Sequence, residues 1–327
     1  MGFPSTGSGF WNKSGMPNSR QKAWHWRGAF LAAGFALLVS SCGVVSITYQ
    51  VAPSFIYWRL DQALDFDARQ ADDVRAKLDR LHSWHRRNEL AGYARLLGEV
   101  QTRIGRPVSA EDVTWVHEEV RRRYTRILDA AMADAVEVVA GLRGEQAGAL
   151  ERRFARMSAD FERKVVDVSP ERAREEFFRQ VLRSVERWYG AFDDTARARL
   201  RGLADKVPLD RRLELEDLRR RQRELVVLLR DVSAGKITAR GEIGERLGRF
   251  FGRWEEGRTI PYAEYAERNR AALHRLYAEA ATLATPGQRE RARRELQSYI
   301  DEITALTPPR TASREGVPAQ AHARSLE

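Results

Sequence analysis

Two histidines and a glutamate fall on one face of a helix that the sequence predicts near residue 80. His82 and His85 are three positions apart, and Glu89 follows His85 by four. Residues three and four apart are neighbours on a helix surface, and imidazole and carboxylate groups are ligands for zinc and similar metals. The spacing therefore permits a metal site, and with it a metal-dependent or hydrolytic enzyme.

The same segment also fits a packing role. His85 continues an apolar stripe that starts before Leu78, and Trp84 lies beside it. A backbone carbonyl would then satisfy the imidazole, and Arg86 and Arg87 would complete a surface or packing motif with Trp84. Because the chain has no HExxH motif and no further cluster of cysteine and histidine, we expect packing and neither a metal nor another cofactor.

The second candidate for chemistry is Cys42, the single cysteine of the chain. With Val39, Ser40 and Ser41 it resembles a bacterial lipobox, in which a signal peptidase recognises an aliphatic residue and two small ones before the cysteine. A diacylglyceryl group on the thiol and an N-acyl chain on the new N-terminus would follow. Several acyl chains, at about 0.8 kcal/mol per buried CH₂, hold a protein on a membrane.

The residues before Cys42 have the layout of a signal peptide. A basic stretch precedes residues 28–39, which are apolar but shorter than the roughly 20 residues needed to span a membrane. We expect residues 1–41 to be removed, with Met16 as the true start. Gly43 replaces the aspartate that commonly retains lipoproteins at the inner membrane, so the expected location is the periplasmic face of the outer membrane.

The segments that carry these residues read as helices almost throughout. After Asp61, apolar residues recur at steps of three and four, and no stretch alternates convincingly with period two. Side chains that cap helix N-termini occur at Ser109, Ser169, Asp193 and Thr285. We predict an all-α protein whose single domain contains about nine amphipathic helices.

The chain divides into four parts by composition. Residues 1–41 are the signal peptide, 42–60 the lipidated N-terminus with an apolar lead-in, and 61–307 the helical periplasmic domain. Residues 308–327 have lost the apolar pattern, which predicts a disordered tail. The lead-in either packs on the body or lies at the lipid interface. We favour packing, because free interfacial segments carry more cationic residues.

Charge gives little support for a nucleic-acid partner. The net charge is +10, but residues 1–41 hold four basic residues and no acid, which leaves +6 for the rest. The arginine runs at 121–123 and 219–221 follow acidic residues by four positions, an order that stabilises exposed helices. We therefore expect solvated helix faces there and no nucleic acid.

Other ligand and catalytic patterns are missing from the sequence. The acids between Asp61 and Asp73 lack the glycine and the final glutamate of an EF-hand loop, and charges at a helix start explain Asp65 and Asp67 more simply. The chain has no GxSxG motif and no glycine-rich phosphate loop. We therefore expect a protein that is not an enzyme.

Residues 49–97 resemble the start of a Gram-negative lipoprotein family known only as a domain of unknown function. The segment LHSWHRRNEL at 81–90 is the most particular part, and the similarity extends through 215–229 to 299–303. This resemblance implies an all-helical envelope lipoprotein without a known activity. The helix starts that carry glutamine are also loosely similar to those of small periplasmic stress chaperones.

These observations predict a lipid-anchored, non-enzymatic envelope protein that is monomeric or weakly oligomeric. Its expected partners are envelope proteins, unfolded chains or peptidoglycan, bound through a helical surface. Two alternatives remain open. One is a metal-dependent enzyme that uses His82, His85 and Glu89, and the other is a purely structural spacer without a specific ligand.

Overall fold

The computed structural model describes residues 44–253, 257 and 259–308. Within these residues the protein has eleven α-helices, one π-helical turn and no strand. In chain order the elements are α1 (Val44–Leu64), α2 (Ala68–Asn88), α3 (Leu90–Arg103), α4 (Ala110–Ala140), α5 (Gly144–Phe161), η2 (Glu162–Val166), α6 (Pro170–Tyr189), α7 (Asp194–Ala204), α8 (Arg211–Ser233), α9 (Arg240–Gly252), α10 (Ile260–Leu283) and α11 (Pro286–Leu306).

The predicted all-α class is confirmed, but the described part of the chain has eleven helices rather than about nine. α1 is a regular helix through the apolar lead-in and past Asp61, although it contains Pro53. α2 and α3 are separated only at Glu89, whose dihedral angles (φ −107°, ψ −35°) are close to helical values. No glycine or proline marks that break, so the hydrophobic pattern continues through it and predicts one helix where there are two.

The helix starts predicted from capping residues all form. The N-cap side chains that accept a hydrogen bond from a backbone amide of the first turn include those of Ser109, Ser169, Asp193 and Thr285. At Ser109 the side chain of Asp112 bonds back to the cap amide, and at Thr285 the side chain of Gln288 does the same. Each reciprocal pair satisfies two amides that a helix end leaves without partners.

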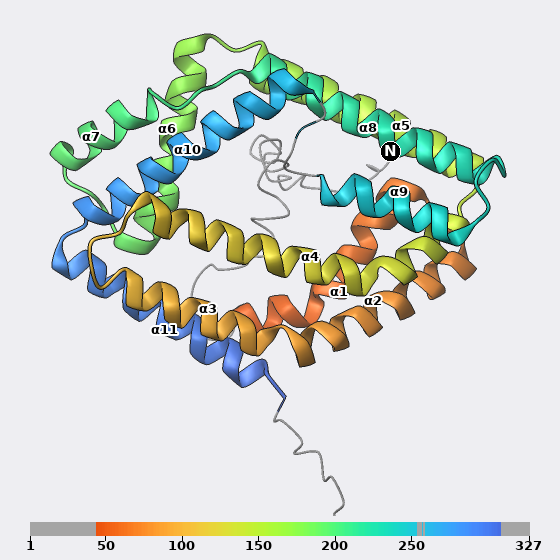
Figure 1. The fold of residues 1–327 in the computed structure, drawn as a ribbon, viewed down its shortest axis with the longest axis horizontal. Helices are drawn as coiled ribbons and strands as arrows, with labels where there is room; N and C mark the ends of the chain where they lie inside the picture. The colour runs from red at the N-terminus through yellow and green to blue at the C-terminus, as the bar shows by residue number, and fades with distance from the viewer. Residues whose placement is uncertain (1–43, 254–256, 258, 309–327) are drawn as a thin grey trace, which may run out of the picture.

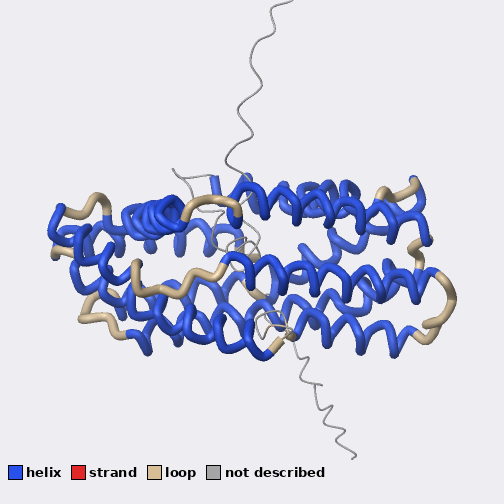
Figure 2. The backbone as a smooth tube through the Cα atoms, turned by 90° about the horizontal axis from the view of Figure 1, so that it is seen from above, coloured by secondary structure: helices blue, strands red, loops and turns tan. Residues whose placement is uncertain are grey.

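The helices are arranged as a flattened frame (Figure 1). α5 and α8 run side by side along one edge, and α3 and α11 run along the opposite edge. α6, α7 and α10 gather at one end, while α4 crosses between the edges and packs against α9 and α10. Figure 2, turned by 90°, shows the smaller depth of the frame.

Apolar side chains form several local cores. The first lies between α6, α7 and α10 around Leu200 and Leu276, which are fully buried. A second joins α3 to α11 through Leu97 and Leu296, and a third joins α4, α8 and α9 around Leu247. A fourth lies between α5 and α8 and reaches the end of α1. Each core therefore stabilises one group of neighbouring helices.

None of the helices in the described residues has both the length and the apolar character that crossing a membrane requires. The predicted disordered tail, residues 308–327, lies outside the described residues except for residue 308.

Candidate functional site

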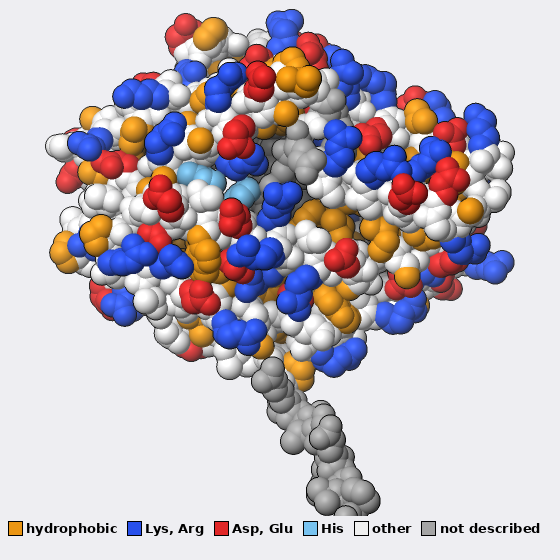
Figure 3. Space-filling model, viewed as in Figure 1, with side chains coloured by type: hydrophobic (Ala, Val, Ile, Leu, Met, Phe, Trp, Pro, Cys, Tyr) orange, Lys and Arg blue, Asp and Glu red, His pale blue; other side chains and the backbone are white. Residues whose placement is uncertain are grey.

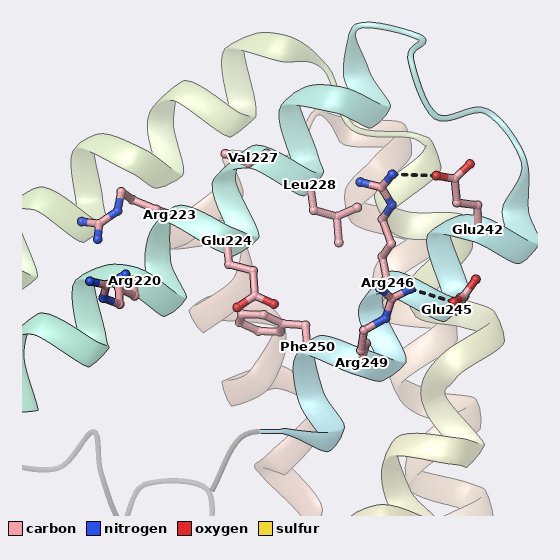
Figure 4. A pocket seen from close by; sticks show the side chains of 10 residues that line it. All are labelled: Arg220, Arg223, Glu224, Val227, Leu228, Glu242, Glu245, Arg246, Arg249 and Phe250. Carbon is pink, nitrogen blue, oxygen red and sulfur yellow. Dashed lines mark hydrogen bonds and ion pairs between the residues drawn. The ribbon is translucent and has the colours of Figure 1, made fainter. Parts of the chain in front are cut away.

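A cleft of about 700 Å³ opens between α8 and α9 (Figure 4). One wall is the second half of α8 and the other is α9. The residues that line it are four arginines, three glutamates and three apolar residues: Arg220, Arg223, Glu224, Val227, Leu228, Glu242, Glu245, Arg246, Arg249 and Phe250. The lining holds no serine, threonine, cysteine, tyrosine, lysine or histidine, so it offers charge and apolar contact rather than a nucleophile.

The two walls of the cleft differ in how their charges are paired. On α9, Arg246 donates to Glu242 at 2.7 Å, and Arg249 donates to Glu245 at 2.7 Å, as the dashed lines in Figure 4 show. On α8, neither Arg220 nor Arg223 has an ion pair or hydrogen bond to a described residue. The α8 wall therefore carries two guanidinium groups at the edge of the cleft, while the carboxylate of Glu224 on the same wall points toward Phe250 (Figure 4).

Apolar surface lies directly beside these guanidinium groups. Val227, one turn after Arg223 on α8, is 53% exposed, whereas Leu228 and Phe250 are buried beneath the cleft. Exposing a valine to water is unfavourable by a small amount, and at this position it adjoins Arg223. The combination suits a ligand that carries both carboxylates and an apolar group.

A smaller hollow of about 290 Å³ lies on the other side of α8, against α5. Arg223 lines both hollows, and Ser158 donates to Gln222 at 2.7 Å in the floor of the second one. The side chain of Arg223 therefore stands between two surface depressions, which makes it the central charge of this part of the molecule.

The predicted metal-ligand set does not come together as a site. Nε2 of His82 lies 3.1 Å from the carbonyl oxygen of Tyr49 on α1, and the phenol of Tyr49 lies 3.0 Å from Nδ1 of His85. Pro53 has no amide hydrogen, so it cannot donate to the carbonyl of Tyr49 four residues earlier. His82 takes the place of the missing amide donor. Because a carbonyl oxygen can only accept, Nε2 of His82 carries the proton.

Burial shifts the pKa values of both partners in this contact between α1 and α2. It lowers the pKa of His85 to about 4 and raises the pKa of Tyr49 to about 12. The imidazole of His85 is therefore neutral at neutral pH, and its ring also lies 5.5 Å from that of Tyr93 on α3. The histidines of LHSWHRRNEL thus join three helices.

Glu89, the third residue of the predicted set, makes a separate contact with α4. Its carboxylate is buried, and Oε1 lies 2.8 Å from Nη2 of Arg126 on α4. Among the described residues, no group of three or more histidine, cysteine, aspartate or glutamate side chains is placed to hold a metal ion.

The other residues of the motif also make structural contacts. Nε of Arg86 donates to the carbonyl oxygen of Leu306, at the end of α11, at 2.8 Å. The backbone carbonyl of Trp84 accepts a hydrogen bond from the side chain of Asn88 at 2.7 Å. The indole ring of Trp84 is half-buried, whereas Arg87 is exposed. The motif therefore connects α2 to α1, α3, α4 and α11.

The predicted lipobox lies outside the described residues. This applies to Val39, Ser40, Ser41 and Cys42, because the description of the chain starts with α1 at Val44. Lipidation at Cys42 and the cleavage before it stay predictions.

Figure 3 shows basic and acidic side chains interspersed over the face in view. The arginine runs, however, are only partly the solvated faces that were expected. Arg123 pairs with Glu119 four positions earlier on α4, as the spacing predicts, whereas Arg122 pairs mainly with Glu119 and lies 4.0 Å from Glu118. Arg221, however, is buried and lies 2.7 Å from the buried carboxylate of Asp217. The prediction of a solvated face is wrong for Arg221, because α8 has packed neighbours on that side.

The acidic residues near the start of α2 have partners of their own. Asp67 caps α2 and pairs with Arg143, and Asp61 accepts a hydrogen bond from the amide of Phe66 at 3.2 Å. Asp65 is not a helix-start acid: it follows α1 with a positive φ of 52°. Asp61 and Asp67 are therefore held by groups of the protein itself.

The sequence reading missed the cleft. Arg223 and Val227 belong to a run that resembles any amphipathic helix, and only the packing of α9 beside α8 turns that surface into a depression. A local signal was present in the four-residue spacing of glutamate and arginine along α9, which predicts the pairs but not what they face.

One family comparison gives a match. The family described as "Family of unknown function (DUF6279)" matches residues 62–243. No curated protein and no solved structure matches the chain. The matched range holds more than half of the chain, including the motif at 81–90 and the α8 wall of the cleft. The chain therefore belongs to this family of unknown function, DUF6279.

Proposed function

We propose that the protein is a lipid-anchored lipoprotein on the periplasmic face of the outer membrane that binds other envelope proteins without catalysing a reaction. Its binding surface is the cleft between α8 and α9, and its ligand is a protein segment with acidic and apolar side chains. The anchor is a diacylglyceryl and N-acyl group on Cys42.

The observation that carries the binding role is the composition of the cleft. The α8 wall offers Arg220 and Arg223, which pair with no described residue, next to the exposed Val227. Guanidinium groups bind carboxylates in bidentate geometry, and an exposed apolar side chain favours a partner that covers it. A segment with aspartate or glutamate near an aliphatic or aromatic residue satisfies both requirements.

The support for the anchor comes from the sequence. The basic stretch, the short apolar segment and the small residues before Cys42 together form the lipobox pattern. Mass spectrometry of the protein from cell membranes is expected to find an N-terminal peptide that begins at Cys42 with three acyl chains. A free thiol at Cys42, or an uncleaved leader, would contradict the anchor and leave the cleft proposal standing.

A displayed peptide library tests the cleft. The purified full chain should enrich peptides that place acidic residues beside an apolar one. Reversing the charge of Arg220 and Arg223 together (Arg220→Glu with Arg223→Glu) should weaken binding of such a peptide by more than about tenfold, because two charge pairs become repulsive.

Arg87→Glu is the matched control for this test. Arg87 is also an exposed arginine without an ion pair to a described residue, but it lies on α2. Its reversal should change binding by less than about twofold, the size of a screened long-range effect. Equal weakening by both variants would show non-specific attraction, and a library without enriched acidic peptides would favour the structural spacer.

A chaperone-like role is a broader form of the same proposal, in which the ligand is any unfolded chain. In that case the full chain at an equimolar ratio should suppress the aggregation of a denatured client, and the double charge reversal on α8 should reduce this effect. Suppression that is unchanged by the reversal would assign client binding to a surface other than the cleft.

A further inference from the structure

α1 carries an apolar face that nothing in the described structure covers. Ile47, Val51, Phe55 and Trp58 are between 49% and 65% exposed. They are separated by four, four and three residues, so at 3.6 residues per turn their side chains fall within an arc of about 80°. We call these four residues the α1 apolar face.

This face is unusual for the molecule. Within residues 44–253, 257 and 259–308, the other exposed large apolar residues are Ile56, also on α1, Val227 on α8 and Ile260 on α10. Five of these seven residues therefore lie on a single helix. Isolated exposed apolar residues are ordinary, but a row of them marks a surface that meets another apolar phase.

The opposite side of α1 is held firmly against the body. Tyr49 contacts His82 and His85 on α2, Val45 packs against the core between α3 and α11, and Leu64 packs against the core between α5 and α8. A helix that is apolar all round is normally buried all round. Because α1 is held on its other side, its apolar face cannot turn inward, and covering it takes a surface beyond the described residues.

Arginines lie beside the C-terminal half of the α1 apolar face. Arg59 follows Trp58 and lies 5.9 Å from the centre of its ring. Arg153 on α5 donates to the carbonyl oxygen of Gln62 at 2.8 Å. Burial and the positive charges of Arg59 and Arg156 lower the pKa of Arg153, so three guanidinium groups are close together.

α1 itself carries one arginine, Arg59, and α5 supplies Arg153 and Arg156. Only together do the apolar side chains, the tryptophan and these arginines have the composition of a surface that lies in a membrane interface. A helix in such a surface buries its apolar face among the acyl chains, while arginines contact the lipid phosphates and tryptophan prefers the boundary between them. An apolar protein surface could also pack against the α1 apolar face, but it would then have to bury or neutralise the arginines.

We infer that the α1 apolar face lies in the interfacial region of the membrane leaflet that faces the periplasm, with the helix axis parallel to the membrane. The inference rests on the proposed lipid anchor, because Cys42 is two residues before Val44 and the acylated residue would hold the N-terminal end of α1 within about 7 Å of the bilayer. The body would then rest against the membrane instead of extending from it on a tether.

Site-directed spin labelling of the full chain tests this orientation. The unsubstituted chain has a single cysteine, which takes no thiol label when it is acylated. Phe55→Cys places a label on the α1 apolar face, and Ile260→Cys places one at an exposed apolar position on α10. Both variants are reconstituted into vesicles of phosphatidylethanolamine and phosphatidylglycerol, and collision with oxygen and with an aqueous nickel complex is measured.

The label at residue 55 is expected to collide with oxygen and to be protected from the nickel complex at least tenfold relative to the label at residue 260. Equal nickel accessibility at both positions, with no label on the unsubstituted chain, would overturn the inference and leave the anchor intact. Spin–spin broadening at residue 55 in detergent without lipid would assign the face to a second copy of the chain, which also overturns it.

Labelling of the unsubstituted chain would show a free Cys42 and contradict the anchor separately. The two label positions are then compared in a Cys42→Ser background mixed with the same vesicles. Protection of residue 55 from the nickel complex would still support the lipid-facing helix, and its absence would overturn it.

Discussion

The imidazole of His82 donates from Nε2 to the carbonyl oxygen of Tyr49 at 3.1 Å, in place of the amide that Pro53 lacks. A proline inside a helix normally leaves such a carbonyl without its partner. The segment LHSWHRRNEL, through His82 on α2, thus supplies the hydrogen-bond donor that α1 lacks, and this contact holds α1 against the body.

Replacing His82 should therefore destabilise the protein through α1. We expect His82→Phe to lower the free energy of unfolding by about 1–2 kcal/mol, because a partly buried carbonyl loses its donor. In a Pro53→Ala background the alanine amide supplies that donor, so the same substitution should cost about 1 kcal/mol less. Urea denaturation of the four chains measures the difference, and a cost that is independent of residue 53 would disprove the exchange of donors.

Acidification should destabilise the protein through His85. Burial lowers the pKa of His85 from 6.5 to about 4 in the folded protein, so the unfolded chain binds a proton at a higher pH than the folded one. The stability is then complete above pH 6.5 and falls as the pH decreases toward 4. Between pH 7 and pH 5 the loss should be about 1–2 kcal/mol.

The control for this pH effect is His85→Gln, which removes the titrating group. Between pH 7 and pH 5, the unfolding free energy of this variant should fall by less than that of the unsubstituted protein. The difference should equal the loss of about 1–2 kcal/mol assigned to His85. Identical pH profiles for the two proteins would show that other groups, such as His274, whose pKa is also lowered by burial, dominate the acid response.

The carboxylate of Asp112 should contribute far more stability than an exposed acid on the same helix. It accepts hydrogen bonds from Arg103 at 2.6 Å and from Arg106 at 2.7 Å, and it also bonds the cap amide of Ser109. We expect Asp112→Asn to cost about 2–3 kcal/mol. Glu118→Gln, which removes an exposed partner 4.0 Å from Arg122, should change stability by less than about 0.5 kcal/mol. Thermal or urea unfolding compares the two, and equal costs would refute this assignment.

Two glycine substitutions should have opposite signs. Gly190 ends α6 with a φ of 79°, which disfavours any residue with a Cβ, while a Cβ there would meet Arg291 only at an ordinary 3.5 Å. Gly190→Ala should therefore cost about 1 kcal/mol from backbone strain. Gly202, inside α7, has open space around it, so Gly202→Ala should stabilise the protein by up to about 1 kcal/mol. A stabilising Gly190→Ala would exclude the positive φ at this position.

Local features of the fold could be predicted from the sequence because they depend on residues a few positions apart. The capping pairs Ser109 with Asp112 and Thr285 with Gln288 form as expected, as does the ion pair of Glu119 with Arg123. Each of these contacts closes within one turn of helix, so tertiary packing has little influence on whether it forms.

Contacts between distant helices were beyond the sequence patterns. The buried ion pair of Arg221 with Asp217 looks like any exposed pair in the sequence, since only the helices packed around α8 exclude water from it. The role of His82 likewise depends on a proline 29 positions earlier in the chain. The cleft depends on how α9 lies beside α8, which no short-range pattern encodes.

The pairing of α3 with α11 has a consequence for how the chain is made. The side chain of Gln101 donates to the carbonyl oxygen of Arg293, across 192 positions. At 5–20 residues per second, the ribosome needs roughly 10–40 s to synthesise that interval. Until then α3 lacks its main partner, α11, so the core that joins these two helices is completed only after the C-terminal helix has been synthesised.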